Sequence, residues 1–227
     1  MTATIAPITS SLPSAEWPEF LEGIIVLHGG MRRDVDRLPV AIERTTDRSG
    51  AVAIQRWFAK FEREVVHHHE REDDVVWPIL LEAAPEFGDP LGQLEEDHHG
   101  LDAAMTATRQ ALDALTATYS YDTCVAAADA ARALARLLHD HLDREEAAMF
   151  PAMARVFTAE SFEQLEQELL KATPKRLFAF ELPFAFDGLA ADRVTSTLAE
   201  MPALIRLVHR FVWQPRYDRL VAPLRAG

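Results

Sequence analysis

Two stretches of the chain, VHHHEREDDVVWPIL at residues 66–80 and HDHLDREEAAMFPAM at residues 139–153, are near-copies of each other and decide the fold. When the two stretches are aligned without gaps, His68 falls opposite His141 and Glu72 falls opposite Glu145. In both copies a histidine precedes a glutamate by four residues, a spacing that puts both side chains on one face of a helix. An imidazole and a carboxylate on one face, twice over, predict a metal site built by helices.

The segments around both copies have the apolar spacing of helices packed in a bundle. Around the first copy, apolar and motif residues recur at gaps of three and four: Ile54, Trp57, Phe61, Val65, His68, Glu72, Val75 and Ile79. No strand-like alternation competes with this pattern. We predict long helices at about residues 18–38, 51–83, 91–117 and 122–157. Because their connections are short, the fold class is expected to be all-α, an up-down-up-down four-helix bundle.

The chain divides into three parts at sequence level. Residues 1–16 are rich in Ser, Thr and Pro and predict a disordered leader, and residues 17–157 form the metal-binding bundle. Residues 39–50 are expected to connect its first two helices, although their first part is compatible with helix. Residues 158–227 are expected to be a C-terminal helical extension.

Within this extension, Thr158 predicts the N-cap of a helix at about 159–172, and further helices are predicted at about 190–200 and 203–221. The segment LFAFELPFAFDGL at 177–189 is expected to be irregular. The Phe, Leu and Trp content of the extension requires burial, either against the bundle or against a partner chain, including a second copy.

Composition excludes several classes of function. The chain has 227 residues and a formal net charge of −13, which argues against a nucleic-acid partner. Its one cysteine, Cys124, cannot form an internal disulfide, which fits a reducing cytosol. There is no apolar run long enough for a membrane span and no signal-peptide pattern at the start, so we expect a cytoplasmic protein without a membrane partner.

Six polar residues interrupt the apolar stripes of the four predicted helices: His28, His68, Glu72, His98, His141 and Glu145. Burying an unpaired imidazole is unfavourable, and burying an unpaired carboxylate is far more so. Two glutamates among four histidines are therefore best explained by two metal ions, with the carboxylates as bridges and positions left open for a small ligand. Mixed nitrogen and oxygen ligation suits iron best, with manganese or zinc as alternatives.

Several neighbouring residues compete for these roles. Glu146 is the rival of Glu145, and His69, four residues after Val65, could also reach the site. The remaining histidines are expected to face solvent or to be structural: His67, His99, His139 and His209. Asp73, Asp102 and Glu70 are candidate hydrogen-bond acceptors for the free nitrogens of the ligand imidazoles. Of these three, Glu70 is more readily explained as a solvated surface residue.

The ligand pattern resembles the hemerythrin family, specifically its HHE cation-binding branch. The family motif has one His on the first helix, H-x3-E on the second, one His on the third and H-x3-E on the fourth. The residues that match it are His28, His68 with Glu72, His98, and His141 with Glu145. The flanking EDDVVWP, EEAAMFP and DHHGL segments are also similar, and the resemblance covers about residues 17–157. The tail is similar to extensions on some actinobacterial members.

The chain departs from the oxygen-carrying members of that family at two positions. Those members have a second His four residues after the third-helix ligand, where this chain has Asp102, and a bridging Asp five residues after the fourth-helix His, where it has Glu146. The seven-ligand set with five histidines is therefore not expected. The resemblance implies two iron ions joined by an oxo or hydroxo bridge.

The function expected from the resemblance is that of a non-haem di-iron protein binding O2, NO or H2O2 for sensing or detoxification. A peroxide- or NO-consuming enzyme would need the same ligands. One alternative is an iron- or redox-responsive regulatory module acting through its extension. The other is a ferritin-like carboxylate protein, because the chain contains Glu64 with His67 and Glu95 with His98 at E-x-x-H spacing.

Overall fold

The computed structural model describes residues 17–225, apart from the side chains at positions 90, 95, 172 and 175. The leader predicted at residues 1–16 lies outside this range. Every element in the described range is helical. No helix within it has both the length and the apolar character needed to cross a membrane.

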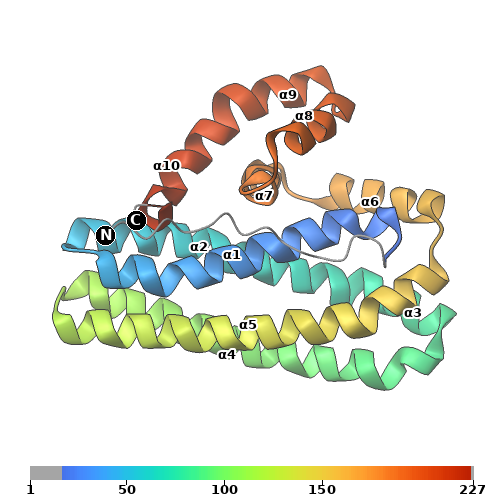
Figure 1. Cartoon of the computed structure of the whole chain (residues 1–227). Coiled ribbons are helices and arrows are strands. Elements are labelled where there is room, and N and C mark those ends of the chain that lie inside the picture. The colour runs from blue at the N-terminus through green and yellow to red at the C-terminus, as the bar shows by residue number, and fades with distance from the viewer. Residues whose placement is uncertain (1–16, 226–227) are drawn as a thin grey trace.

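Four long helices form an up-down-up-down bundle, which confirms the predicted fold class (Figure 1). They are α1 (Glu22–Arg44), α2 (Arg48–Arg71), α4 (Gly88–Ala117) and α5 (Tyr121–Val156), with a single 3-10 turn at Glu19–Leu21 before α1. Side-chain caps fix two of the starts. Asp47 accepts a hydrogen bond from the Gly50 amide at the start of α2, and Ser120 forms a capping box with Thr123 at the start of α5.

The first helix is longer than its predicted range of 18–38. It continues through Pro39 to Arg44, so most of the expected connection is helical. Burial of Ala41 and Ile42 in the bundle core explains why the helix persists past a residue that lacks an amide hydrogen.

The second predicted helix, 51–83, is interrupted by a π-helical turn. Helix α2 ends at Arg71, the π-turn η2 covers Glu72–Val76, α3 covers Trp77–Ala83, and a 3-10 turn, η3, follows at Pro85–Phe87. Pro78 at the start of α3 cannot donate to the carbonyl four residues earlier, and such a missing bond favours a local change of helix type. The turn begins at one of the predicted ligands.

The C-terminal extension is helical throughout its described part, except in short connections. Its elements are α6 (Ala159–Ala172), α7 (Lys175–Phe186), α8 (Ala191–Glu200), α9 (Ala203–Val208), the π-turn η4 (His209–Trp213) and α10 (Gln214–Arg225). Thr158 caps α6 as predicted, by accepting from the Ser161 amide. The prediction of an irregular segment at 177–189 is wrong, because α7 occupies most of it. Burial of Phe180 and Phe184 against the bundle stabilises that helix despite Pro183.

Two helices of the extension, α7 and α10, contribute to the bundle core. Helices α7 and α10 each contact both α1 and α2, so they cover the seam between these two helices (Figure 1). Their buried residues Phe180, Phe184, Tyr217, Val221 and Leu224 belong to the same apolar cluster as the bundle interior between residues 27 and 142. A second apolar cluster lies at the other end of the bundle, around Trp77, Phe150 and Phe162. The predicted ligands occupy the polar layer between these two clusters.

Candidate metal centre

Four bundle helices bring seven potential ligands together in this layer. One group consists of His69, His98 and His141, and the other of His28, His68, Glu72 and Glu145. Within each group, one ligand atom from every residue lies within 4.8 Å of the others. All seven residues are at most 5% exposed. A cluster so deeply buried and so polar requires an internal partner.

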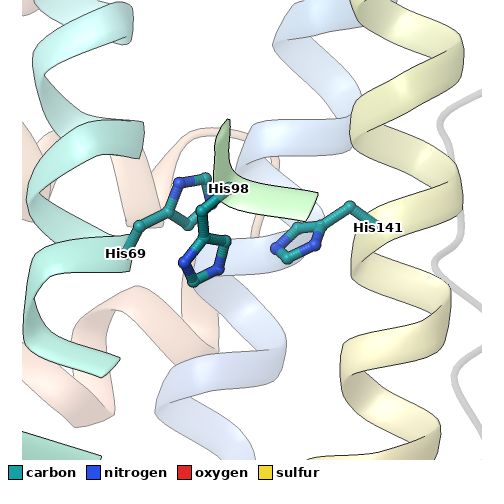
Figure 2. Close-up of side chains that lie close together, drawn as sticks. All are labelled: His69, His98 and His141. Atoms are coloured by element: carbon teal, nitrogen blue, oxygen red, sulfur yellow. The ribbon is translucent and has the colours of Figure 1, made fainter. Parts of the chain in front are cut away.

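The three-histidine half is formed by α2, α4 and α5, whose imidazoles point toward one another (Figure 2). His69 stacks on His98 with ring centroids 4.0 Å apart and an interplanar angle of 9°. His141 stands edge-on to both rings, at 5.1 Å from His69 and 4.9 Å from His98. Both ring nitrogens of His69 and of His141 lack hydrogen-bond partners, which leaves them free as metal ligands.

The two-histidine half lies between α1 and α2. His28 Nε2 is 3.0 Å from His68 Nε2, and the two rings are nearly perpendicular, at 88°. Two nitrogens that each lie ~2.1 Å from one ion, at right angles, are separated by roughly 3 Å. The pair therefore has the spacing of two ligands on one ion.

Each glutamate has one oxygen near each half. Glu72 Oε1 lies 3.1 Å from His68 Nε2, and its Oε2 lies 3.7 Å from His98 Nε2. Glu145 Oε1 lies 3.2 Å from His28 Nε2, and its Oε2 lies 3.3 Å from His141 Nε2. Both carboxylates thus lie between the two histidine groups, with one oxygen toward each.

Acidic side chains orient several of the imidazoles from outside the cluster. His98 Nδ1 donates to Asp73 (3.0 Å), as predicted, and His28 Nδ1 donates to Glu146 (2.9 Å). Arg32 in turn donates to Glu146 (2.6 Å). These contacts leave Nε2 of each histidine directed into the cluster, which is the usual arrangement around metal-binding histidines.

Burial and mutual contact shift the pKa values of the ionisable groups in the layer. Burial lowers the pKa of His28, but Glu145 and Glu146 outweigh it and raise this pKa to about 9. Burial and the neighbouring Glu145 raise the pKa of Glu72 well above its usual value. Burial lowers the pKa of His68 to about 3 and that of His69 well below its usual range. Neutral imidazoles are the form that binds metal.

The donor set fits bound metal cations. In the protein alone, the following ligand atoms are buried without a hydrogen-bond partner: Glu72 Oε2, His98 Nε2, both nitrogens of His69 and His141, and both oxygens of Glu145. Unpartnered atoms of this number in one buried layer are unfavourable unless they bind ions. The arrangement offers five imidazoles and two carboxylates, which suits iron, manganese or zinc.

The structure brings together all six residues selected from the sequence. It also settles the position of the rival carboxylate, since Glu145 lies in the cluster and Glu146 contacts His28 from outside. His99, Glu70 and Asp102 are exposed, and His139 pairs with Asp36 at 2.9 Å. The residue that the prediction left open is His69. Its spacing from Val65 was the available signal, but His68 already filled the motif position.

A buried layer with two groups of cation ligands, inside a four-helix bundle, defines a helical metal-binding protein. The chain matches the family model of the hemerythrin HHE cation binding domain over residues 21–153, and it belongs to this family. No curated protein and no solved structure matches the chain. The family assignment agrees with cation binding at the layer and covers all seven ligand positions.

Proposed function

We propose that this protein is a non-haem di-iron protein that binds O2, NO or H2O2 for sensing or detoxification. The observation that carries the proposal is the orientation of Glu72 and Glu145, each with its two oxygens directed at different histidine groups. A single ion would not require two carboxylates that both span the cluster. Two ions joined by these carboxylates, and by an oxo or hydroxo bridge, would use every donor.

The division of donors supports binding of a small ligand at one ion. The three-histidine half has three nitrogens and two bridging carboxylate oxygens available, whereas the half containing His28 and His68 has only two nitrogens beside the same two carboxylates. The two-histidine half therefore has one more open position. When bound, a pair of iron ions supplies one-electron changes at each ion.

The surrounding residues would keep bulk water from this position. Phe150 lies parallel to the His28 ring at 6.3 Å, and Phe184 from the extension is completely buried beside α1. An apolar enclosure of this kind strengthens electrostatic interactions inside it and excludes competing solvent. These features support chemistry on a small uncharged molecule more than on an extended substrate.

The test is the metal content and optical spectrum of protein purified from iron-replete cells. We expect about two irons per chain and the charge-transfer bands of an oxo-bridged ferric pair. Replacing His68 or Glu72 should remove metal. A folded wild-type protein that retains no iron, or that binds only zinc under these conditions, would contradict the proposal.

The Glu64–His67 pair of the ferritin-like alternative gains no support from the site. Glu64 is buried on α2, but it belongs to neither ligand group, and His67 also lies outside both. Replacement of Glu64 should leave the metal content unchanged under our proposal, whereas a ferritin-like site would lose metal.

A catalytic role at the same centre is the second candidate. Its distinguishing measurement is the reaction of the iron-loaded protein with excess peroxide. Oxygen release would indicate peroxide disproportionation, and a long-lived oxygen adduct would indicate a carrier.

A regulatory role is favoured by the packing of the extension, because α7 and α10 cover the seam between α1 and α2, the helices that carry His28 and His68. It predicts that metal changes the hydrogen exchange of residues 159–225.

A further inference from the structure

Helix α9 and the π-turn η4 carry an apolar stripe that faces solvent. Its three side chains are Leu204 (69% exposed), Leu207 (56%) and Phe211 (63%). In the described range, only Tyr121 is a more exposed large apolar side chain. The stripe residues follow one another at gaps of three and four, so they lie on one face of the helix. Exposed apolar side chains gathered in this way mark an interaction site.

The opposite face of the same helix is packed on α7. The buried ring of His209 lies 5.5 Å from that of Phe186, and Trp213 stands edge-on to Phe178 with ring centroids 5.5 Å apart. Helix α9 itself buries no residue, and Figure 1 shows α8 and α9 standing away from the four bundle helices. The fold therefore fixes the direction of the stripe, and residues 17–225 of the same chain leave it uncovered.

The charge around the stripe is positive. Residues 203–217 contain three arginines, Arg206, Arg210 and Arg216, and no Asp or Glu. All three are exposed, and none pairs with a carboxylate in the described part of the chain. The guanidinium of Arg210 lies 5.3 Å from the centroid of the Phe211 ring, at the edge of the stripe. A complementary surface would be apolar with negative charges around it.

This chain has such a surface where η2, α3 and the start of α4 meet. Residues 73–92, here termed the acidic end, contain five acidic residues and no Lys or Arg. Asp74, Glu82 and Asp89 are exposed, and among the described residues they have no ion-pair partner. Their charges are therefore available to a basic partner.

A hollow of about 140 Å³ lies among these carboxylates. Its apolar wall consists of Trp77, Pro78, Leu81 and Leu91, and Leu81 is 39% exposed. A cavity of about 150 Å³ can hold a benzene ring, so this hollow can receive one apolar side chain. Asp73 also lines it and hydrogen-bonds to His98 (3.0 Å), so whatever fills the hollow adjoins the metal layer.

We propose that the apolar stripe of α9 and η4 docks on the acidic end of a second copy of this chain. One apolar side chain of the stripe enters the hollow, and the arginines beside the stripe face the exposed carboxylates around it. Because the contact joins two different surfaces, its repetition closes a ring or extends a row of copies. An anionic membrane is a less suitable partner, since the net charge of −13 opposes approach to it.

The first test is the mass of the full-length chain in solution, measured by light scattering. Wild type should associate beyond a single chain, and association should weaken as salt is raised, because salt screens the attraction between the two surfaces. Leu207→Asp should raise the dissociation constant at least ~10-fold. The matched control is Leu170→Asp on α6, where the leucine is 51% exposed, and it should leave association unchanged.

The second test changes the other surface. Leu81→Asp places a charge at the hollow and should weaken association by at least the same ~10-fold. Its matched control is Leu137→Asp on α5, at a leucine that is 43% exposed and distant in sequence from both surfaces. Because all four leucines are exposed in the single chain, these substitutions should not unfold it.

Mixing the two variants identifies the contact. Leu207→Asp keeps an intact acidic end, and Leu81→Asp keeps an intact stripe. Each variant alone should remain a single chain, whereas an equal mixture should form a species of two chains, one of each variant. This species also requires that both variants are folded.

Three results would overturn the proposal. One is a wild type that remains a single chain at low salt, including one that binds vesicles of anionic phospholipid through the stripe. Another is association that survives Leu81→Asp but not Leu207→Asp, because stripes would then bind one another. The third is a mixture of the two variants in which every chain stays single.

Discussion

His69 and His98 lie face to face, 4.0 Å apart and 9° from parallel, and this contact joins a histidine from α2 to the ligand group of α4 and α5. Asp102, the position at which oxygen-carrying relatives have their extra ligand, is exposed. His69 thereby restores a total of five histidines in the layer. We therefore propose His69 as a seventh candidate ligand beside the six that the sequence predicts.

We predict that His69→Gln lowers the iron content from about two to about one ion per chain, because the three-histidine half would lose one of its three nitrogens. The measurement is metal analysis after reconstitution with ferrous iron. His99→Gln, an exposed neighbour of His98, is the matched control and should retain both ions. Full iron content in His69→Gln would show that His69 only packs against His98.

The metal-free protein should lose stability as the pH rises above neutrality. The pKa of His28 is raised from 6.5 to about 9, so its stabilising proton is fully present below pH 6.5 and is lost as the pH passes about 9. Glu72 and Glu64, whose pKa values are also raised, hold protons that the unfolded chain has released, and act in the same direction. Thermal unfolding between pH 6.5 and 9 should show a falling Tm.

Metal loading should weaken this pH dependence by displacing the proton of His28. We expect release of about one proton per chain from His28 when the metal-free protein binds zinc at pH 7, because a metal-bound imidazole must be neutral. Calorimetry in buffers of different ionisation enthalpy measures this number. A release near zero would indicate that the ligands are already deprotonated.

The extension should be needed for stability of the bundle. Phe184→Ala removes a completely buried ring from the cluster that α7 shares with the bundle, and should lower the free energy of unfolding by about 3–5 kcal/mol. Phe211 is 63% exposed, and Phe211→Ala should change stability by less than about 0.5 kcal/mol. Urea titration of both variants measures the contrast. Equal values would mean that α7 is not part of the core.

Alanine substitutions at two adjacent glycines of α1 should change the stability of the protein in opposite directions. A Cβ at Gly29 would meet nothing within 4 Å, so Gly29→Ala should stabilise the helix by about 0.5–1 kcal/mol. A Cβ at Gly30 would lie 3.0 Å from Phe184 Cε1, and that ring is fixed by Phe180 and Phe61. Gly30→Ala should therefore destabilise by about 1–3 kcal/mol. Similar Tm changes in both variants would contradict the close packing of α7 on α1.

The sequence predicted the bundle and six of the seven clustered residues because a repeat and a helical spacing can both be recognised from residue positions along the chain. The repeat related His68 to His141, and the apolar stripe singled out His28 and His98. His69 could not be selected in this way, since its neighbour already filled the motif position and its stacking on His98 depends on tertiary packing. The helix α7 was missed for a similar reason: contacts with α1 and α2 stabilise its aromatic sequence, which local propensity does not favour.

The polar layer also divides the molecule into two parts that fold around different apolar clusters, one including α7 and α10 and the other including Trp77, Phe150 and Phe162. Helices α1 and α5 are continuous through the layer, but α2 gives way to its π-turn there. Ions bound across the layer would therefore couple the unfolding of the two parts. The same seven side chains that form the proposed reaction centre would then determine whether the bundle unfolds in one cooperative step or in two.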